Sequence, residues 1–433
     1  MKKLIFLSFL FFLGCREKPA ESYFTAAKAS KYFKDLREIC DKDQGGLWGA
    51  NLYGPVMFVD RTTRRIISNQ PDEAGLLKGK DGIYTGIYPR EQMISNSPVS
   101  FGGKEFSLVA LPPEEDDYRI KSRALHVLFH SFQLRNGIKP VLFNQTNMDD
   151  REARLWLKLE WKALQKAFRT DGNERMVAIR DALVFRGAGR ELYQNYTIES
   201  NRFETYDGLA TFTSVKLLSA SVAERNKRLM EGLDRVYRMA SYARSYGSIH
   251  GALYASLLFD AGYDFQTLNA DSTDLGELVR NVYKISLPAI CRDVAGSLAL
   301  SYDLADVTRE EEERLRNIEE RTRELTGKFT ERDVVYLELE SPYFDFEPED
   351  IHPVDTLGTL YNALRVSDSW GKLSVDKGGC LVSGNYRYMR ISAKGFRVEK
   401  NRVSGEGWNL ILNDGWEIIP VKQDYFLRKV IPL

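Results

Sequence analysis

Residues 119–134 read RIKSRALHVLFHSFQL, and the spacing of their apolar positions predicts an amphipathic helix. The apolar side chains that recur at helical spacing are Ile120, Leu125, Leu128, Phe129 and Phe132. His126, His130 and Gln133 form a second stripe at i, i+4 and i+7. Two imidazoles four residues apart on a helix point the same way and can hold one metal ion. Taken alone, this spacing is a weak signal, because it also fits two half-buried histidines that bond to backbone carbonyls, and both interpretations stay open here.

The residue that follows the first histidine is the unusual one. In the H-E-x-x-H helix of zinc peptidases, a Glu at this position takes a proton from the metal-bound water and passes it to the leaving amine. This chain has Val127 instead, which can neither accept nor donate a proton. The motif therefore predicts a metal-binding scaffold that lacks the usual general base.

Further segments carry a resemblance over most of the chain. They are residues 52–60 (LYGPVMFVD), 126–133, 156–164 (WLKLEWKAL), 207–210 (DGLA), 370–373 (WGKL) and 414–416 (DGW). In this order they resemble a family of bacterial secreted proteins built on an H-E-L-F-H-R-x-Q helix, which is itself similar to the gluzincin zinc metallopeptidases. The resemblance implies a mainly helical, metallopeptidase-like core and a zinc cofactor.

The resemblance also implies a third zinc ligand, a Glu in a stretch similar to N-E-G-L-A-E-Y-T. Residues 206–213 read YDGLATFT, so Asp207 stands at the implied ligand position with a side chain one methylene shorter. Thr211 replaces a second Glu, whose place in the family implies that it orients a ligand histidine. The implied site is therefore His126, His130 and Asp207, and its three departures from the family pattern predict lost or altered catalysis.

Two other carboxylates are candidates for the missing base. Glu204 lies three residues before the implied ligand and would share its face on a continuous helix, as a substitute ligand or base. Its alternative is a solvated acid at a helix start. Glu160 lies in an apolar helical segment, where burial without a partner is costly. It could bond to a ligand histidine, or it could form a structural pair with Arg180 or Arg186.

The remaining reactive side chains give weaker signals. His250, in the stretch SIHG, either approaches the site and binds a substrate oxygen or is structural, and the structural role is favoured. His352 also lies outside the motif. Cys40, Cys291 and Cys380 show no C-x-x-C spacing, and we expect buried thiols rather than a disulfide.

The start of the chain predicts where the protein is located. Lys2 and Lys3 precede the apolar run 4–13, which stops at Gly14-Cys15 and is too short to span a bilayer permanently. This layout resembles a bacterial lipobox. It predicts a lipoprotein signal peptide over residues 1–15 and a lipid anchor on Cys15 at a bacterial cell-envelope membrane. The alternative is a plain cleaved signal with an incidental cysteine.

The charge balance limits the class of partner. Lys plus Arg equal Asp plus Glu, at 61 each, so no single-sign field favours nucleic acid. The sequence contains no Walker loop, no G-x-G-x-x-G and no G-x-S-x-G motif. The partners that remain are the membrane, through the anchor, and a peptide or protein ligand.

An α+β fold follows from the patterns along the chain. Residues 16–46 should form a tether and an N-terminal helix, and residues 47–330 a metallopeptidase-like domain with a β region (47–112) and a helical core (119–328). A charged helix, 308–325, should connect this domain to a small antiparallel β module at 331–433. Within the module, Asn413-Asp414-Gly415 predicts a hairpin turn.

Three functions are compatible with these features. The leading hypothesis is a membrane-anchored lipoprotein whose degenerate metallopeptidase-like domain binds without cleaving, a pseudopeptidase. The first alternative is an active zinc-dependent peptidase or hydrolase with a non-standard general base. The second is a structural surface lipoprotein without metal.

Overall fold

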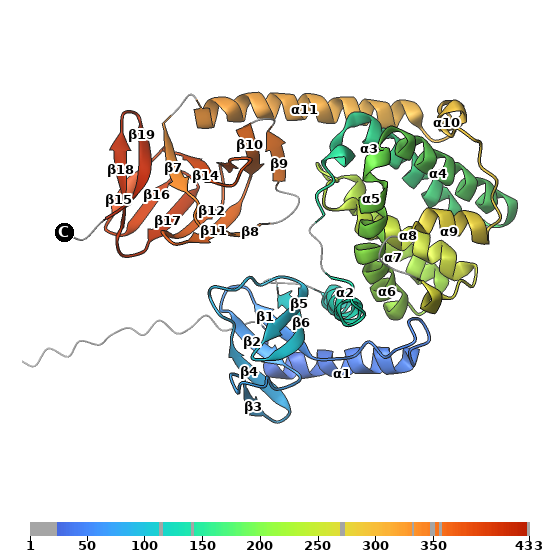
Figure 1. The fold of residues 1–433 in the computed structure, drawn as a ribbon, viewed down its shortest axis with the longest axis horizontal. Coiled ribbons are helices and arrows are strands. Elements are labelled where there is room, and N and C mark those ends of the chain that lie inside the picture. The colour runs from blue at the N-terminus through green and yellow to red at the C-terminus, as the bar shows by residue number, and fades with distance from the viewer. Residues whose placement is uncertain are drawn as a thin grey trace, which may run out of the picture.

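The computed structural model describes residues 24–111, 116–139, 143–268, 273–330, 333–346, 351–354 and 357–430. The fold is α+β, as the sequence predicts, with an N-terminal sheet, a helical core and a C-terminal β module (Figure 1). The predicted signal peptide and Cys15 lie outside the described residues. None of the described helices is both long and apolar enough to cross a membrane.

The N-terminal region combines one helix with a six-stranded sheet of order β3-β4-β2-β1-β6-β5. Its elements are α1 (Ala26–Asp43), β1 (Val56–Asp60), β2 (Arg65–Ser68), β3 (Lys78–Lys80), β4 (Ile83–Ile87), β5 (Ser97–Phe101) and β6 (Lys104–Leu111). Neighbouring strands are antiparallel except β1 and β6, which are parallel. The apolar patterns of residues 56–59, 65–67, 82–88 and 105–111 predict four of these strands. The two edge strands lack the pattern, because β3 is fully exposed and β5 contains Pro98.

The helical core follows directly after β6. Its main helices are α2 (Asp117–Arg135), α3 (Arg151–Ala167), α4 (Gly172–Leu192), α5 (Thr197–Phe203), α6 (Leu209–Leu218), α7 (Val222–Tyr237), α8 (Tyr246–Asp260), α9 (Leu275–Val282) and α10 (Arg292–Ala299). Short turns of other helical types are η1 (Thr146–Asp149), η2 (Gln194–Tyr196), η3 (Glu204–Gly208) and η4 (Phe265–Thr267). One hydrophobic core joins these helices to α1 and to one face of the sheet, as Phe33, Phe58 and Leu128 illustrate.

A long helix, α11 (Leu304–Thr330), leads from the helical core to the C-terminal module (Figure 1). It covers the connecting helix predicted at 308–325. One part of it is not solvated, because Glu311 is fully buried against α3. Arg154 Nε donates to both oxygens of this carboxylate, at 3.1 and 2.9 Å, and Lys158 Nζ lies 3.0 Å away. The ion pairs fix the start of α11 to the helical core.

The C-terminal module is a sandwich of two sheets around a core of its own. One sheet has the order β18-β19-β7-β14-β13-β10-β9 and the other β15-β16-β17-β12-β11-β8. The strands are β7 (Val334–Glu338), β8 (Tyr343–Asp345), β9 (Ile351–Val354), β10 (Gly358–Tyr361), β11 (Leu364–Asp368), β12 (Gly371–Val375), β13 (Cys380–Val382), β14 (Tyr388–Ser392), β15 (Arg397–Glu399), β16 (Arg402–Gly405), β17 (Trp408–Leu412), β18 (Trp416–Val421) and β19 (Asp424–Lys429). All pairs are antiparallel except β19 with β7.

The hairpin predicted at Asn413-Asp414-Gly415 is wrong. The turn exists, with Gly415 at φ +84°, but it carries the chain from β17 in one sheet to β18 in the other. β18 pairs with β19, and β17 pairs with β12 and β16. The signal N-D-G identifies a tight turn, whereas the pairing of the flanking strands depends on contacts distant in sequence.

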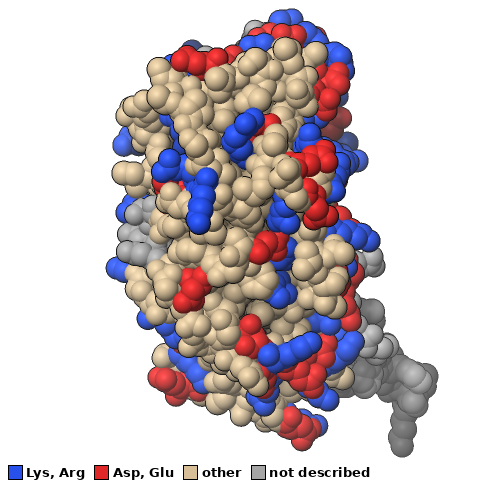
Figure 2. Space-filling view, turned by 90° about the vertical axis from the view of Figure 1, so that its right-hand side faces the viewer, with Lys and Arg blue, Asp and Glu red and all other residues tan. Residues whose placement is uncertain are grey.

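Basic and acidic side chains are interspersed on the face of the molecule shown in Figure 2. This face therefore carries no extended area of one sign, as the balanced composition leads us to expect.

Candidate metal centre

The helix that carries the two motif histidines is α2, which packs against β6 and α6. Asp116 caps its N-terminus by accepting a hydrogen bond from the Arg119 backbone N–H at 2.8 Å. The apolar stripe predicted from the sequence is buried in these contacts except for Phe132, which is half-buried. Because α2 is fixed on both sides, the second stripe presents His126 and His130 toward the segment that follows α5.

Asp207 lies in that segment, on the π-helical turn η3 between α5 and α6. The turn lies against α8, where a Cβ on Gly208 would be only 2.5 Å from Gly251 Cα. Glycine at both positions makes this backbone contact possible. Such π turns are rare and are frequently found at functional sites. Here the turn directs Asp207 toward α2.

The structure brings the three predicted residues together. His130 Nε2 is 2.9 Å from His126 Nε2 and 3.4 Å from Asp207 Oδ1. One ligand atom of each residue lies within 4.8 Å of the others. His130 is buried, whereas His126 and Asp207 are half-buried. The group could hold a metal ion, and the Asp207 side chain reaches the histidines in spite of its shorter length.

Gln133 determines which nitrogen of His130 is free. Gln133 Nε2 donates to the Tyr206 carbonyl at 3.2 Å, and since that oxygen can only accept, Gln133 Oε1 must be the atom 2.7 Å from His130 Nδ1. A neutral His130 therefore carries its proton on Nδ1 and presents the lone pair of Nε2 to His126 and Asp207. This is the arrangement found in histidines that bind metals.

The surroundings of His126 also favour the neutral form of its imidazole, which is the form that binds a metal. Burial, and secondarily the charges of His130 and Arg123, lower the pKa of His126 well below its ordinary value. Metal binding requires the unprotonated ring, so this shift fits a ligand role. Thr211 Oγ1 is 3.5 Å from His126 Nδ1, at the position where the family resemblance implies an orienting carboxylate. A hydroxyl at that distance is a weak substitute.

The residue at the position of the missing base is apolar, and its surroundings in the fold are buried as well. Val127 is fully buried in the core beside His126. It offers no group that could move a proton at the metal position.

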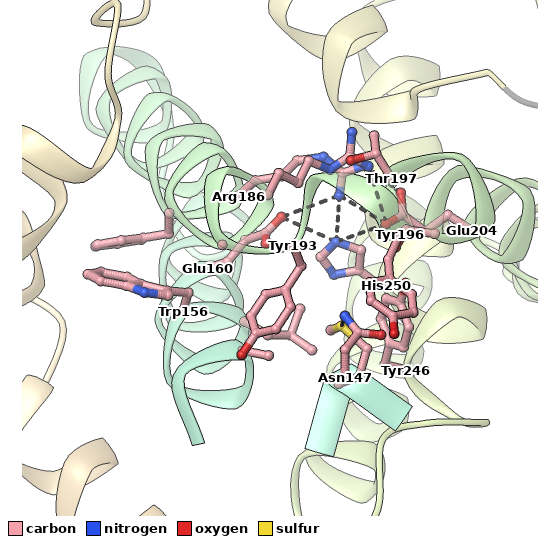
Figure 3. Close-up of a pocket in the computed structure, with 17 residues that line it drawn as sticks. Asn147, Trp156, Glu160, Arg186, Tyr193, Tyr196, Thr197, Glu204, Tyr246 and His250 are labelled. Carbon is pink, nitrogen blue, oxygen red and sulfur yellow. Dashed lines mark hydrogen bonds and ion pairs between the residues drawn. The ribbon is translucent and has the colours of Figure 1, made fainter. Parts of the chain in front are cut away.

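The two carboxylates considered as substitutes belong to a different cluster (Figure 3). Glu204 is buried and not a solvated acid, and Arg186 donates to its two oxygens at 3.1 and 2.5 Å. On a regular α-helix, Glu204 would share a face with Asp207. The hydrogen bonds of a π turn span five residues instead of four, so Glu204 points to α4 while Asp207 points to α2.

Glu160 forms a structural pair with Arg186, at 3.7 Å between Oε1 and Nη1. Arg180 is not its partner, because that guanidinium bonds to Asp181 at 2.7 Å. The histidine near Glu160 is His250, with 3.2 Å between Nε2 and Oε1, and not a histidine of the motif. Glu160 therefore lies away from the group that could hold a metal.

His250 has the structural role that was favoured, at the centre of this buried cluster. Its two ring nitrogens both face N–H donors, Trp161 Nε1 at 2.9 Å and Arg186 Nη1 at 2.8 Å. A neutral imidazole can accept only one of these hydrogen bonds. The carboxylates of Glu160 and Glu204 are consequently the dominant partners of the Arg186 guanidinium.

The cluster stabilises its ionised carboxylates. Burial alone would raise the pKa of Glu160, but His250, Arg186 and Tyr254 hold it below its ordinary value of 4.5. The pKa of Asp274, at the start of α9, is lowered in the same way. Burial opposes ionisation of this carboxyl group, but Arg186 and Arg190 hold its pKa far below 3.8. Sequence reasoning considered the pair of Glu160 with Arg186 but missed Asp274. The only available signal was an arginine inside the apolar pattern of α4.

The three cysteines of the described chain are free and buried, as expected. Burial, with smaller contributions from Asp41 and Asp43, raises the pKa of the Cys40 thiol to about 12. A thiol with such a pKa is a poor nucleophile and a poor metal ligand at neutral pH.

Comparisons with protein-family models, with curated proteins and with solved structures gave no match. The interpretation of the group formed by His126, His130 and Asp207 accordingly depends on its geometry and on the sequence motifs.

Proposed function

We propose that the protein binds zinc at His126, His130 and Asp207 and is a non-catalytic binding protein of the bacterial cell envelope. In this proposal it is a pseudopeptidase that holds a peptide or protein ligand without cleaving it. The observation that carries the proposal is the approach of two imidazole nitrogens and one carboxylate oxygen to within 4.8 Å of one another.

Zinc suits this set of donors. Imidazole nitrogens and a carboxylate oxygen are common zinc ligands, and the hydrogen bond from His130 Nδ1 to Gln133 supplies the outer support that such ligands need. Three protein ligands leave one coordination position for a carbonyl or carboxylate oxygen of a bound partner. When bound, zinc would supply a Lewis acid toward that oxygen.

The surroundings of the group favour binding over cleavage. Peptide hydrolysis needs a side chain that accepts a proton from water and passes it to the leaving amine. The residue at the usual position, Val127, is apolar and buried. The carboxylates of Glu160 and Glu204 are engaged with Arg186 and His250. Neither candidate is thus available to the metal group.

A slow zinc-dependent hydrolase is the second candidate. One observation favours it, because zinc sites with three protein ligands are typically catalytic whereas structural sites use four. Without a general base, its rate should fall by about a hundred- to ten-thousand-fold relative to a complete site.

The envelope location depends on the sequence of the N-terminus. Lys2, Lys3 and the apolar run that ends at Gly14-Cys15 support a lipid anchor on Cys15. Radioactive palmitate fed to bacteria that express the full chain should label the protein, and Cys15→Ala should abolish the label. Equal labelling of both chains would contradict the anchor.

The metal proposal is tested by titrating zinc into the protein under calorimetry. We expect one ion per chain, and we expect His130→Ala to lose the binding while His352→Ala, which changes a histidine outside the group, retains it. Absence of zinc binding by the unmodified protein would instead support a structural lipoprotein without metal.

Peptide turnover with added zinc separates the two metal-binding candidates. A mixture of unrelated peptides should stay intact with the unmodified protein and with His130→Ala. Cleavage that is lost in His130→Ala would replace the pseudopeptidase proposal by the hydrolase.

A further inference from the structure

A cavity of about 60 Å³ lies beside the buried cluster, among α3, α4, α5 and α8 (Figure 3). Aromatic side chains form part of its wall, namely Trp156, Phe185, Tyr193, Tyr196 and Tyr246, and Arg186 and Arg190 also line it. Tyr193 and Tyr196 are half-buried, so one wall is in contact with solvent. A space of this size holds about four water molecules or one small chemical group.

The ionic groups next to the cavity include one more carboxylate than guanidinium groups. Arg186 bonds to Glu204 and to Asp274, and Arg190 also bonds to Asp274. Three carboxylates, those of Glu160, Glu204 and Asp274, thus face two guanidinium groups. With a neutral imidazole, the cluster carries one excess negative charge, and Glu160 is the carboxylate that lies at the cavity wall without a bidentate partner.

Two acceptor atoms at this wall are open to a further donor. Glu160 receives Tyr254, His250 and Arg186 on the single oxygen Oε1, at 2.5, 3.2 and 3.7 Å, which leaves Oε2 for another group. Asn147 is only 6% exposed, and its Oδ1 has no hydrogen-bond partner within the part of the chain that the structure describes. Two buried donors on the same lining, Trp156 Nε1 and Arg186 Nε, also have no hydrogen-bond partner in the described part of the chain. The two acceptors favour a ligand that donates hydrogen bonds, and water beside that ligand can accept from the two donors.

We infer that the cavity binds a primary ammonium group at the end of an alkyl chain. An ammonium group offers three donors and no acceptor, which matches Glu160 Oε2 and Asn147 Oδ1. Its positive charge offsets the excess negative charge of the cluster. Aromatic rings attract cations through their faces, and Tyr193 and Tyr196 are placed where the alkyl chain would leave toward solvent. A water molecule beside the ammonium group can accept from Trp156 Nε1, which also lacks a protein partner in the described chain.

This chemistry has two sources, a free alkylamine or the lysine side chain of a peptide. The inference does not depend on the metal proposal, because the cavity residues and the metal group share no member.

The test compares n-butylammonium with n-butanol, a neutral molecule of similar shape, by calorimetric titration of the full chain at neutral pH. We expect butylammonium to bind at least tenfold more tightly than butanol. Glu160→Gln, which keeps the shape and removes the charge, should weaken butylammonium about tenfold. Glu152→Gln, an exposed change on the same helix, should leave it unaffected, as should His130→Ala.

Because Glu160 is buried, Glu160→Gln could change the fold, so a second variant that leaves the ion pairs intact is needed. Tyr196→Ala, at the half-buried wall, should also weaken butylammonium severalfold while the far-ultraviolet circular dichroism stays unchanged. A short peptide with one lysine, compared with the same peptide acetylated on that lysine, then distinguishes a peptide source from a free amine. Equal binding of butanol and butylammonium, or binding of neither because the cavity holds water only, would overturn the inference.

Discussion

Gln133 connects the candidate metal group to the backbone of the π turn through one amide side chain. Its Oε1 accepts from His130 Nδ1, and its Nε2 donates to the Tyr206 carbonyl, one residue before Asp207. The residue therefore orients one ligand and holds the segment that carries another. Loss of its side chain should therefore weaken the binding of a metal at this group.

Replacement of this side chain gives the residue-scale prediction. Gln133→Leu keeps the volume but removes both hydrogen bonds, and we expect zinc affinity to fall by about ten- to a hundred-fold, the usual cost of losing an outer partner of a ligand histidine. Calorimetric titration measures the change. Gln165→Leu on α3 is the control and should retain full affinity. Unchanged affinity in Gln133→Leu would show that His130 does not depend on this tautomer.

At the same scale, the sequence could predict the candidate metal-binding residues, but it could not predict the role of the other nearby carboxylate, Glu204. The i, i+4 spacing of His126 and His130 follows from helix geometry, and the family resemblance located Asp207. Glu204 was misplaced because its three-residue spacing from Asp207 was interpreted on a regular α-helix. No single side chain in the sequence reports a π turn, since the turn depends on the contact between Gly208 and Gly251.

At the scale of elements, Arg186 of α4 connects three neighbours, since its partners lie on α3, on η3 and at the start of α9. Arg186→Met should lower the free energy of unfolding by about 3 to 5 kcal/mol, because it removes the cation shared by three carboxylates and leaves only Arg190 near two of them. Urea denaturation measures the loss. Combining it with Glu204→Leu should recover part of this loss, since the double variant removes one of the unpaired charges. Arg180→Met, on the same helix but half-exposed, should cost less than about 1 kcal/mol.

The same network predicts a dependence of stability on pH. The folded protein holds the pKa values of Glu160 and Asp274 below 4.5 and 3.8, so in acid the unfolded chain binds protons that the folded chain does not. Their contribution is complete above these values and is lost as the pH falls through the lower pKa values of the folded state. Urea denaturation at a series of pH values below 5 should show this loss. It should be smaller in Arg186→Met, because the pKa values of Glu160 and Asp274 are then depressed less.

The positions of the helices could be predicted from the sequence, whereas the pairing of the strands could not. Helices such as α3 and α4 were located from their periodicity, because burial of one stripe imposes a 3.6-residue repeat on the sequence. The order of the strands in the C-terminal sandwich was not predictable. An alternating apolar pattern indicates that one face of a strand is buried, but it does not indicate which distant strand pairs with it. The turn at Gly415 is an example, because the two strands that it connects lie in different sheets.

At the scale of the whole molecule, two hydrophobic cores are joined by α11. The helical core and the C-terminal sandwich each bury their own apolar residues, and the Glu311 network fixes α11 to the helical side. We expect two transitions in differential scanning calorimetry. Glu311→Ala should lower the stability of the helical part by about 3 to 5 kcal/mol, because it removes the buried carboxylate that Arg154 and Lys158 share and leaves them only Asp149 and Glu310.

Glu313→Ala, an exposed change two residues further along α11, is the matched control and should leave both transitions in place. A single transition that shifts as a whole in Glu311→Ala would show instead that the two cores unfold together.

The π turn has a consequence for how such a chain could diverge from its ancestors. Deleting one residue from the turn would restore a regular α-helix and change the angle between the side chains before and after the deletion by about 100°. Glu204 and Asp207 could then no longer face their present partners at the same time. A change in length, without any substitution, would therefore separate the candidate metal group from the buried ion pairs, so alignments of this segment that ignore gaps would mistake one carboxylate for the other.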